Sequence, residues 1–132
     1  MSGIFNWFKK QKKEAPPYLE RIDELEKLSI VRLKGEIDQS MIPVIEARIQ
    51  ANRRAGSKID KNVVLDFSKV SHVDTATIAF HLYRLREYQE KGFKVGFMNL
   101  TGDMKVLLEM FKANETFKVF QSEEDAVREM NR

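Results

Sequence analysis

The 132-residue sequence contains no cysteine. This absence excludes a disulfide scaffold, thiol catalysis and metal sites built on cysteine. Long hydrophobic runs are missing as well, since no apolar stretch approaches the roughly 18 residues that a membrane-spanning helix needs. Because no signal peptide is visible either, we expect a cytoplasmic protein with one domain of ordinary size and a single core.

The net positive charge of the chain comes from its N-terminus. Lys9, Lys10, Lys12 and Lys13 are four of the 23 basic residues, and residues 1–13 contain no acid. The remaining 19 basic residues stand against 20 acidic ones, so the rest of the chain is close to neutral in spite of a sequence pI of about 9.1. A nucleic-acid-binding domain normally carries a basic stripe on its folded part. We therefore predict no nucleic-acid partner.

Motifs of the common enzyme classes are also missing. The sequence has no glycine-rich phosphate loop, no nucleophile elbow and no paired-histidine zinc motif. His72 could join Asp66 and Asp74 in a metal or acid–base cluster, but the spacing is poor and an incidental loop histidine explains it better. His81, on the flank of a predicted helix, adds nothing to such a cluster. We predict no enzyme activity, no metal and no cofactor.

The N-terminal segment, residues 1–17, differs from the rest of the chain. It ends in two prolines, which mark a boundary before one domain over residues 18–132. The simplest interpretation is a flexible tail. On a helix, however, Ile4, Trp7 and Phe8 would share one side with lysines following, as in segments that lie on a membrane surface. The candidate membrane-contact residues are Phe5, Trp7, Phe8, Lys9 and Lys10.

The hydrophobic pattern after residue 18 predicts an α/β fold. Two strands are expected around a turn near Glu26 and Lys27, and a helix over residues 41–55. NVVLDF, residues 62–67, is a continuous apolar run typical of a central strand buried on both faces. Helices over 75–91, 101–114 and 122–130 then alternate with strands over 93–100 and 116–120. The order predicts a hairpin joined to a parallel, right-handed series: a mixed sheet of about five strands with about four helices.

Two of these helices carry residue-level expectations. In the helix over 75–91, Glu87 should pair with Lys91 at a spacing of four residues, on the outer side. The helix over 101–114 has the cleanest amphipathic pattern in the chain. Its inward face is expected to comprise Met104, Leu107, Leu108 and Phe111.

Asp74, Thr75, Ala76 and Thr77 follow the predicted central strand, where loops and helix N-termini converge in parallel sheets. Asp74 suits the N-cap position, where it would accept a hydrogen bond from the amide of Ala76 or Thr77. A phosphate on Thr75 or Thr77 would lie near the positive end of the helix, but beside the Asp74 carboxylate. The corner is therefore either a plain helix cap or a phosphorylation switch without catalysis.

The chain resembles the STAS domain of anti-sigma-factor antagonists and of sulfate-transporter tails over about residues 18 to 130. The most specific elements are LDFS at 65–68, the following VSHVDTA, and a helix that ends at a glycine turn. The earlier IVRLKGEID is similar to the second strand of that family. The resemblance implies the same α/β fold and a non-enzymatic regulatory module that binds a protein partner through the loop and the helix after it.

In the antagonist branch, a kinase that doubles as anti-sigma factor phosphorylates a motif like Asp-Ser-Ser-Gly and so breaks the complex. Asp74 matches the aspartate of this motif and Thr75 its first hydroxyl, whereas Ala76 and Thr77 replace the second hydroxyl and the glycine. The resemblance makes Thr75 the candidate phosphoacceptor and an anti-sigma factor/serine kinase, or another regulatory protein, the expected partner. The candidate partner-binding residues are Asp74, Thr75, Ala76, Thr77, Phe80 and Tyr83.

A second branch of the family is also similar at this motif. VDTA resembles the STAS subunits that accompany lipid-transport ATPases at the inner membrane, which bind their partner constitutively. The basic, aromatic tail favours that branch. The alternative prediction is therefore an accessory subunit of a membrane transport or signalling complex, peripheral to the inner membrane.

Overall fold

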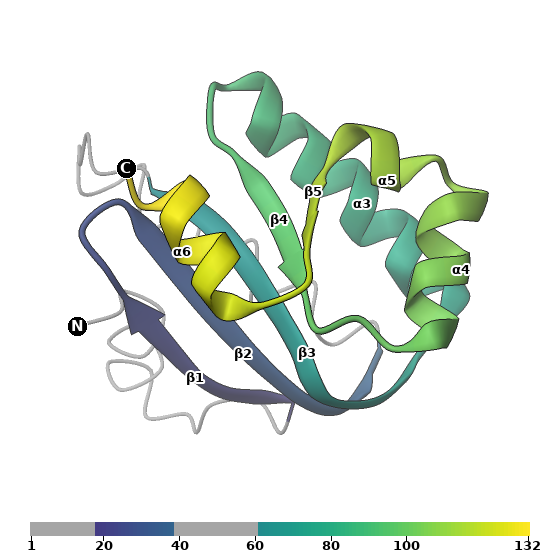
Figure 1. Cartoon of the computed structure of the whole chain (residues 1–132). Helices are drawn as coiled ribbons and strands as arrows, with labels where there is room; N and C mark the ends of the chain where they lie inside the picture. The colour runs from purple at the N-terminus through teal and green to yellow at the C-terminus, as the bar shows by residue number, and fades with distance from the viewer. Residues whose placement is uncertain (1–17, 39–60) are drawn as a thin grey trace, which may run out of the picture.

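The computed structural model describes residues 18–38 and 61–132, which form a sheet covered by helices (Figure 1). The five strands lie in the order β1-β2-β3-β4-β5. β1 pairs with β2 in antiparallel fashion, and the other neighbouring strands are parallel. This confirms the predicted hairpin and parallel series. The strands are β1 (Leu19–Glu24), β2 (Leu28–Ile37), β3 (Asn62–Val73), β4 (Val95–Met98) and β5 (Lys118–Phe120).

Four helices lie in the described part of the chain, and they cover both faces of the sheet. α3, α4 and α5 pack on one face and α6 on the other, so that in Figure 1 α6 stands in front of the sheet and α3 behind it. The predicted α/β fold is confirmed. The predicted helix over 41–55 and the tail over 1–17 lie outside the described residues. The helices are α3 (Thr75–Glu90), α4 (Gly102–Met110), α5 (Ala113–Thr116) and α6 (Glu123–Met130).

β3 is the central strand, as its apolar run predicts, and it is twelve residues long because it continues past residue 67 to Val73. Val64 packs on the α6 side, whereas Leu65 and Phe67 pack on the α3 side. The neighbouring β4 is buried throughout. Gly96 permits this close packing, since a Cβ at that position would lie 2.8 Å from the Phe120 ring. A strand buried on both faces gives the carboxyl end of the sheet a rigid base.

Two expectations about the helices are wrong. The predicted helix over 101–114 is interrupted, because Lys112 adopts a left-handed conformation with φ of 55° between α4 and α5. The turn carries Ala113 into the core in place of Phe111, which remains exposed. The second correction concerns Glu87, which pairs with Arg84 at 3.1 Å and not with Lys91.

Candidate functional site

The candidate corner lies where β3 ends and α3 begins, at the carboxyl end of the sheet. Asp74 occupies the N-cap position in an extended conformation, and its carbonyl accepts from the amide of Ile78 at 3.0 Å. Its own amide donates to the carbonyl of Ile37 at 3.2 Å. The corner is therefore held both by the first turn of α3 and by the end of the neighbouring strand β2.

The side chain of Asp74 does not make the predicted cap. No backbone amide donates to it; instead, the hydroxyl of Thr77 donates to its Oδ2 at 2.7 Å. The carboxylate is turned along the helix because a hydroxyl three residues ahead offers a charge-assisted bond with the right reach. The expectation of an amide bond from Ala76 or Thr77 is thus corrected.

Of the six candidate partner-binding residues, four are exposed, Asp74 is half-buried and one is buried. Thr75 and Ala76 are exposed, and Phe80 and Tyr83 retain 41% and 63% of their accessible surface. Thr77, by contrast, is 1% exposed. Its role in the structure is to hold Asp74, and its hydroxyl faces the interior and not the solvent.

A groove of about 310 Å³ lies between this corner and the first turns of α4. Thr75 lines one side of it, and Thr101 and Asp103 line the other. The N-cap of α4 places these residues, since the Thr101 hydroxyl accepts from the amide of Met104 at 3.3 Å. The groove is completed by Val70, Ser71, His72, Val73, Met104, Val106 and Leu107.

The α4 side of this groove is a candidate functional feature that the sequence interpretation missed. Val106 also lies at the groove, and Met110, one turn further along α4, is 68% exposed. A core-facing amphipathic helix has no packing reason to place two large apolar side chains outward at a spacing of four residues. That spacing is the signal in the sequence that could have identified this wall.

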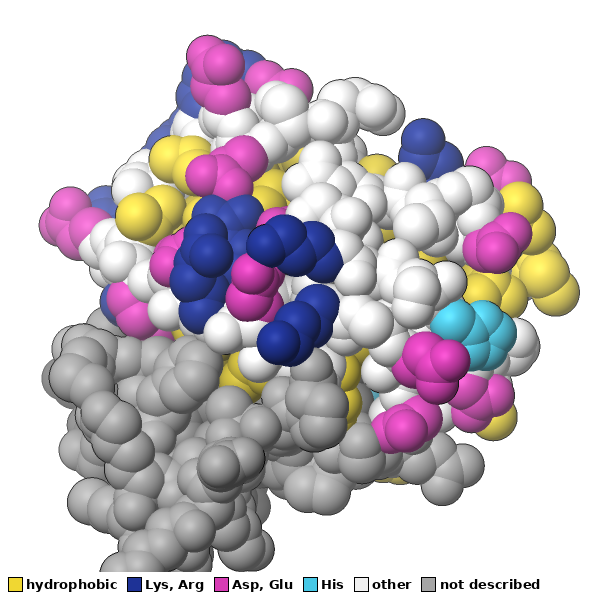
Figure 2. Space-filling view, turned by 90° about the horizontal axis from the view of Figure 1, so that it is seen from below, with side chains coloured by type: hydrophobic (Ala, Val, Ile, Leu, Met, Phe, Trp, Pro, Cys, Tyr) yellow, Lys and Arg dark blue, Asp and Glu magenta, His cyan; other side chains and the backbone are white. Residues whose placement is uncertain are grey.

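The rim of the groove is acidic. Figure 2 shows a histidine among acidic side chains at this end of the molecule, with a hydrophobic patch beside it. Glu36 of β2 is the register neighbour of His72 on β3, and Asp103 shares the groove with His72. Together with Asp74, these carboxylates give the surroundings of Thr75 a negative potential.

Asp66 is part of a separate, structural cluster. It is buried and accepts hydrogen bonds from Arg32, Asn99 and the amide of Ser68, each at 3.0 Å. Burial raises the pKa of Asp66, but the bonds from Asn99, Ser68 and Arg32 outweigh it and hold that pKa below its usual value. In residues 18–38 and 61–132 no group of His, Asp or Glu side chains could hold a metal ion.

His81 is buried in α3, two turns after the corner. Only 3% of its surface is exposed, and neither ring nitrogen has a hydrogen-bond partner. Burial lowers the pKa of His81 to about 4, so that the ring is neutral at pH 7. The ring packs edge-on against Phe80, with centroids 6.1 Å apart. The sequence predicted His81 on the flank of a helix, with no functional role. The structure instead places its ring in the core, without a hydrogen-bond partner.

The described part of the chain contains no helix long and apolar enough to cross a membrane. No match was found among curated proteins. The family model of the STAS domain, in contrast, matches residues 19–126.

Several solved structures have the same fold. The phosphorylated form of the Bacillus cell fate determinant SpoIIAA is 19% identical with a TM-score of 0.63, over 83% of this chain and 96% of that one. A putative anti-sigma factor antagonist from Thermotoga maritima is 12% identical with a TM-score of 0.69, over 85% and 94%. An anti-sigma factor antagonist from Mycobacterium paratuberculosis is 17% identical with a TM-score of 0.62, over 90% and 99%.

At these identities the structural likeness shows the fold alone. The family model covers more than half of the chain, and the element order, the central β3 and the corner before α3 agree with it. The chain therefore belongs to the STAS domain family.

Proposed function

We propose that this protein is a non-enzymatic regulatory module of the cytoplasm that binds a protein partner at the Thr75 corner and releases it when Thr75 is phosphorylated. The observation that carries the proposal is the exposure of Thr75 beside an acidic, partly apolar groove, while the hydroxyl of Thr77, at the glycine position of the motif, is buried. The anti-sigma factor antagonists with the same fold support this function.

The contact surface that we propose combines the corner with the outer side of α3. Thr75 and Ala76 supply its first turn, with the Asp74 carboxylate beside them, and Phe80 and Tyr83 supply apolar area further along. Arg84 lies over the Phe80 ring at 5.8 Å, which keeps that ring in place on the surface. Thr77 acts behind this surface, through its bond to Asp74.

The groove explains how a phosphate on Thr75 would weaken the complex. A phosphate adds a charge of about −1.5 to −2. Asp103 lines the groove and Asp74 directly precedes Thr75, so the phosphate adds to negative charge that is already there. Its bulk and hydration would disrupt an apolar contact with the groove. Release therefore follows if the partner seats an apolar side chain between Thr75 and Val106.

A kinase assay tests the switch. The protein is incubated with ATP and an anti-sigma factor kinase from the same cell, and the product is examined by mass spectrometry. We expect one phosphate within residues 74–77, lost completely in Thr75→Ala. Ser71→Ala is the matched control, because Ser71 is exposed at the same groove and should leave labelling unchanged. Absence of label, or label that persists in Thr75→Ala, would remove Thr75 as the acceptor.

The second candidate function is a constitutive subunit of a complex at the inner membrane. The sequence of the tail favours it, with Phe5, Trp7 and Phe8 ahead of four lysines, as does the missing hydroxyl at Ala76. Vesicle flotation separates the two candidates. Deletion of residues 1–13 should abolish recovery with anionic vesicles if the tail is an anchor, since each lysine contributes about 1 kcal/mol at such a surface. Equal recovery with and without the tail contradicts the anchor.

A further inference from the structure

Basic side chains gather at the end of the sheet opposite Thr75. Lys94 directly precedes β4, Lys118 begins β5, and Arg132 follows α6. β4 and β5 are parallel, so their amino ends open at the same edge. The three cations line one hollow of about 190 Å³, together with Glu129 and Met130. Three basic side chains thus share this hollow with one acidic side chain, that of Glu129.

Hydrogen bonds hold the backbone around this hollow. The side chain of Asn62, at the start of β3, accepts from the amide of Lys94 at 3.0 Å and donates to the carbonyl of Met130 at 2.8 Å. Asn131 accepts from the amide of Lys27 in the β1–β2 turn at 2.8 Å. The starts of β3 and β4 and the end of α6 are therefore fixed beside one another, and the basic residues approach each other from anchored positions.

Within residues 18–38 and 61–132, these three cations are among the basic residues that have no acidic partner. Lys61 pairs with Glu24 and Lys69 with Glu20, whereas no ion pair joins Lys94, Lys118 or Arg132 to an acid. The position of Arg132 has a structural reason, because its Nε donates a hydrogen bond to the carbonyl of Arg128 in the last turn of α6. This explanation does not extend to the two lysines, whose mutual repulsion an anion would relieve.

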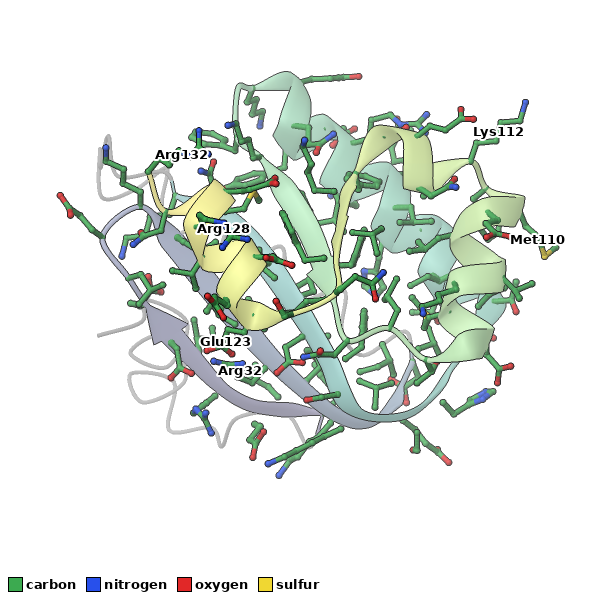
Figure 3. The ribbon with its side chains drawn as sticks, viewed as in Figure 1. Arg32, Met110, Lys112, Glu123, Arg128 and Arg132 are labelled. Atoms are coloured by element: carbon green, nitrogen blue, oxygen red, sulfur yellow. The ribbon has the colours of Figure 1, made fainter. Side chains whose placement is uncertain are left out.

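We propose that this hollow, lined by Lys94, Lys118 and Arg132, binds a phosphate group, either free or on a small molecule or as a lipid headgroup. Two ammonium groups and a guanidinium are the donors that proteins use for phosphate. Figure 3 shows Arg128 and Arg132 at this end of the molecule, with Met110 and Lys112 of the α4 region at the other side. The amino ends of β4 and β5 lie opposite the carboxyl end of the parallel strand β3, after which Thr75 follows, so the site is separate from the Thr75 corner.

The test compares the whole chain with two variants of equal charge. Lys94→Glu with Lys118→Glu removes the site, and Lys105→Glu with Lys112→Glu makes the same change in charge on exposed residues of the α4 region. Circular dichroism verifies that both fold. In the first arm, inorganic phosphate is titrated at constant ionic strength while amide NMR shifts are followed. We expect saturable shifts around 94, 118 and 130–132 in the wild type and the control, and none in the site variant.

The second arm identifies the source of the phosphate. Co-sedimentation is measured with phosphatidylglycerol vesicles and with neutral phosphatidylcholine vesicles. A headgroup site predicts binding to the anionic vesicles that is weaker in the site variant by more than about thirtyfold, because each lost lysine contributes about fivefold and the anionic surface repels each new glutamate. Residues 1–17 are identical in all three proteins, so any contribution of the tail to vesicle binding is the same in each. Lost phosphate shifts with unchanged vesicle binding indicate a soluble ligand, and equal behaviour of the two variants in both arms overturns the proposal.

Discussion

Replacing Arg32 with methionine is expected to lower the free energy of unfolding by about 3–5 kcal/mol, the range for removing one partner of a buried ion pair. The Arg32 guanidinium joins three elements. It donates to Asp66 on β3 at 3.0 Å and to Asp23 on β1 at 2.9 Å, and it also bonds Glu123 at the start of α6. Methionine retains the packing of the stem but leaves the buried Asp66 carboxylate without its counter-ion.

Urea denaturation at pH 7 measures this effect, and Arg21→Met is the matched control. Arg21 also bonds Asp23, at 3.1 Å, but its side chain is 54% exposed, so its loss should cost less than about 1 kcal/mol. A loss below 1 kcal/mol in the Arg32 variant would contradict the assignment of the cluster as a structural tie.

The same cluster has a defined pH dependence. The pKa of Asp66 in the folded protein lies below the ordinary value of 3.8, so the folded state binds the proton less readily than the unfolded chain does. The stabilisation is fully present above the ordinary carboxyl range and is lost as the pH falls through the depressed folded pKa. In Arg32→Met, the pKa of Asp66 should rise toward or above its ordinary value, because burial remains while a cation is removed.

The topology could be predicted from the sequence because it depends on coarse patterns. A continuous apolar run at 62–67 can be stable only as a strand covered on both faces, and helices on either side then force parallel neighbours. The position of the corner follows from the same order, since the residues after a central parallel strand must lie at the carboxyl end of the sheet. These inferences need no knowledge of side-chain packing.

The site details could not be predicted because they depend on packing between distant segments. Thr77 and His81 lie beside the apolar stripe of α3, and their polar side chains suggest exposure, but the packed core buries both. The end of α4 could not be predicted either, because Lys112 adopts a left-handed conformation that is normally expected of glycine or asparagine. The groove joins Thr75 to residues almost thirty positions further along the chain, and no local pattern connects them.

His81→Leu is expected to make the protein more stable, and increasingly so as the pH falls. At pH 7 the gain should be about 1–3 kcal/mol, because leucine fills a similar volume and removes two buried nitrogens that have no hydrogen-bond partner. The substitution also removes the only titrating group of the α3 core stripe formed by Thr77, Ile78, His81, Leu82 and Leu85. The wild-type protein should therefore show a pH dependence that the variant lacks.

The sign of that dependence follows from the two pKa values of His81. The pKa is about 4 in the folded protein against 6.5 for an ordinary histidine, so the unfolded chain takes up a proton first as the pH falls. The contribution of His81 to stability is constant above pH 6.5. It declines by about 3 kcal/mol between pH 6.5 and pH 4 and is constant again at lower pH. Unfolding midpoints in urea from pH 7 to pH 4.5 should separate wild type and variant progressively. His72→Gln is the matched control, because it removes the other histidine of the chain from an exposed position. Parallel curves for wild type and His81→Leu would show that the ring gains a partner or solvent access in solution.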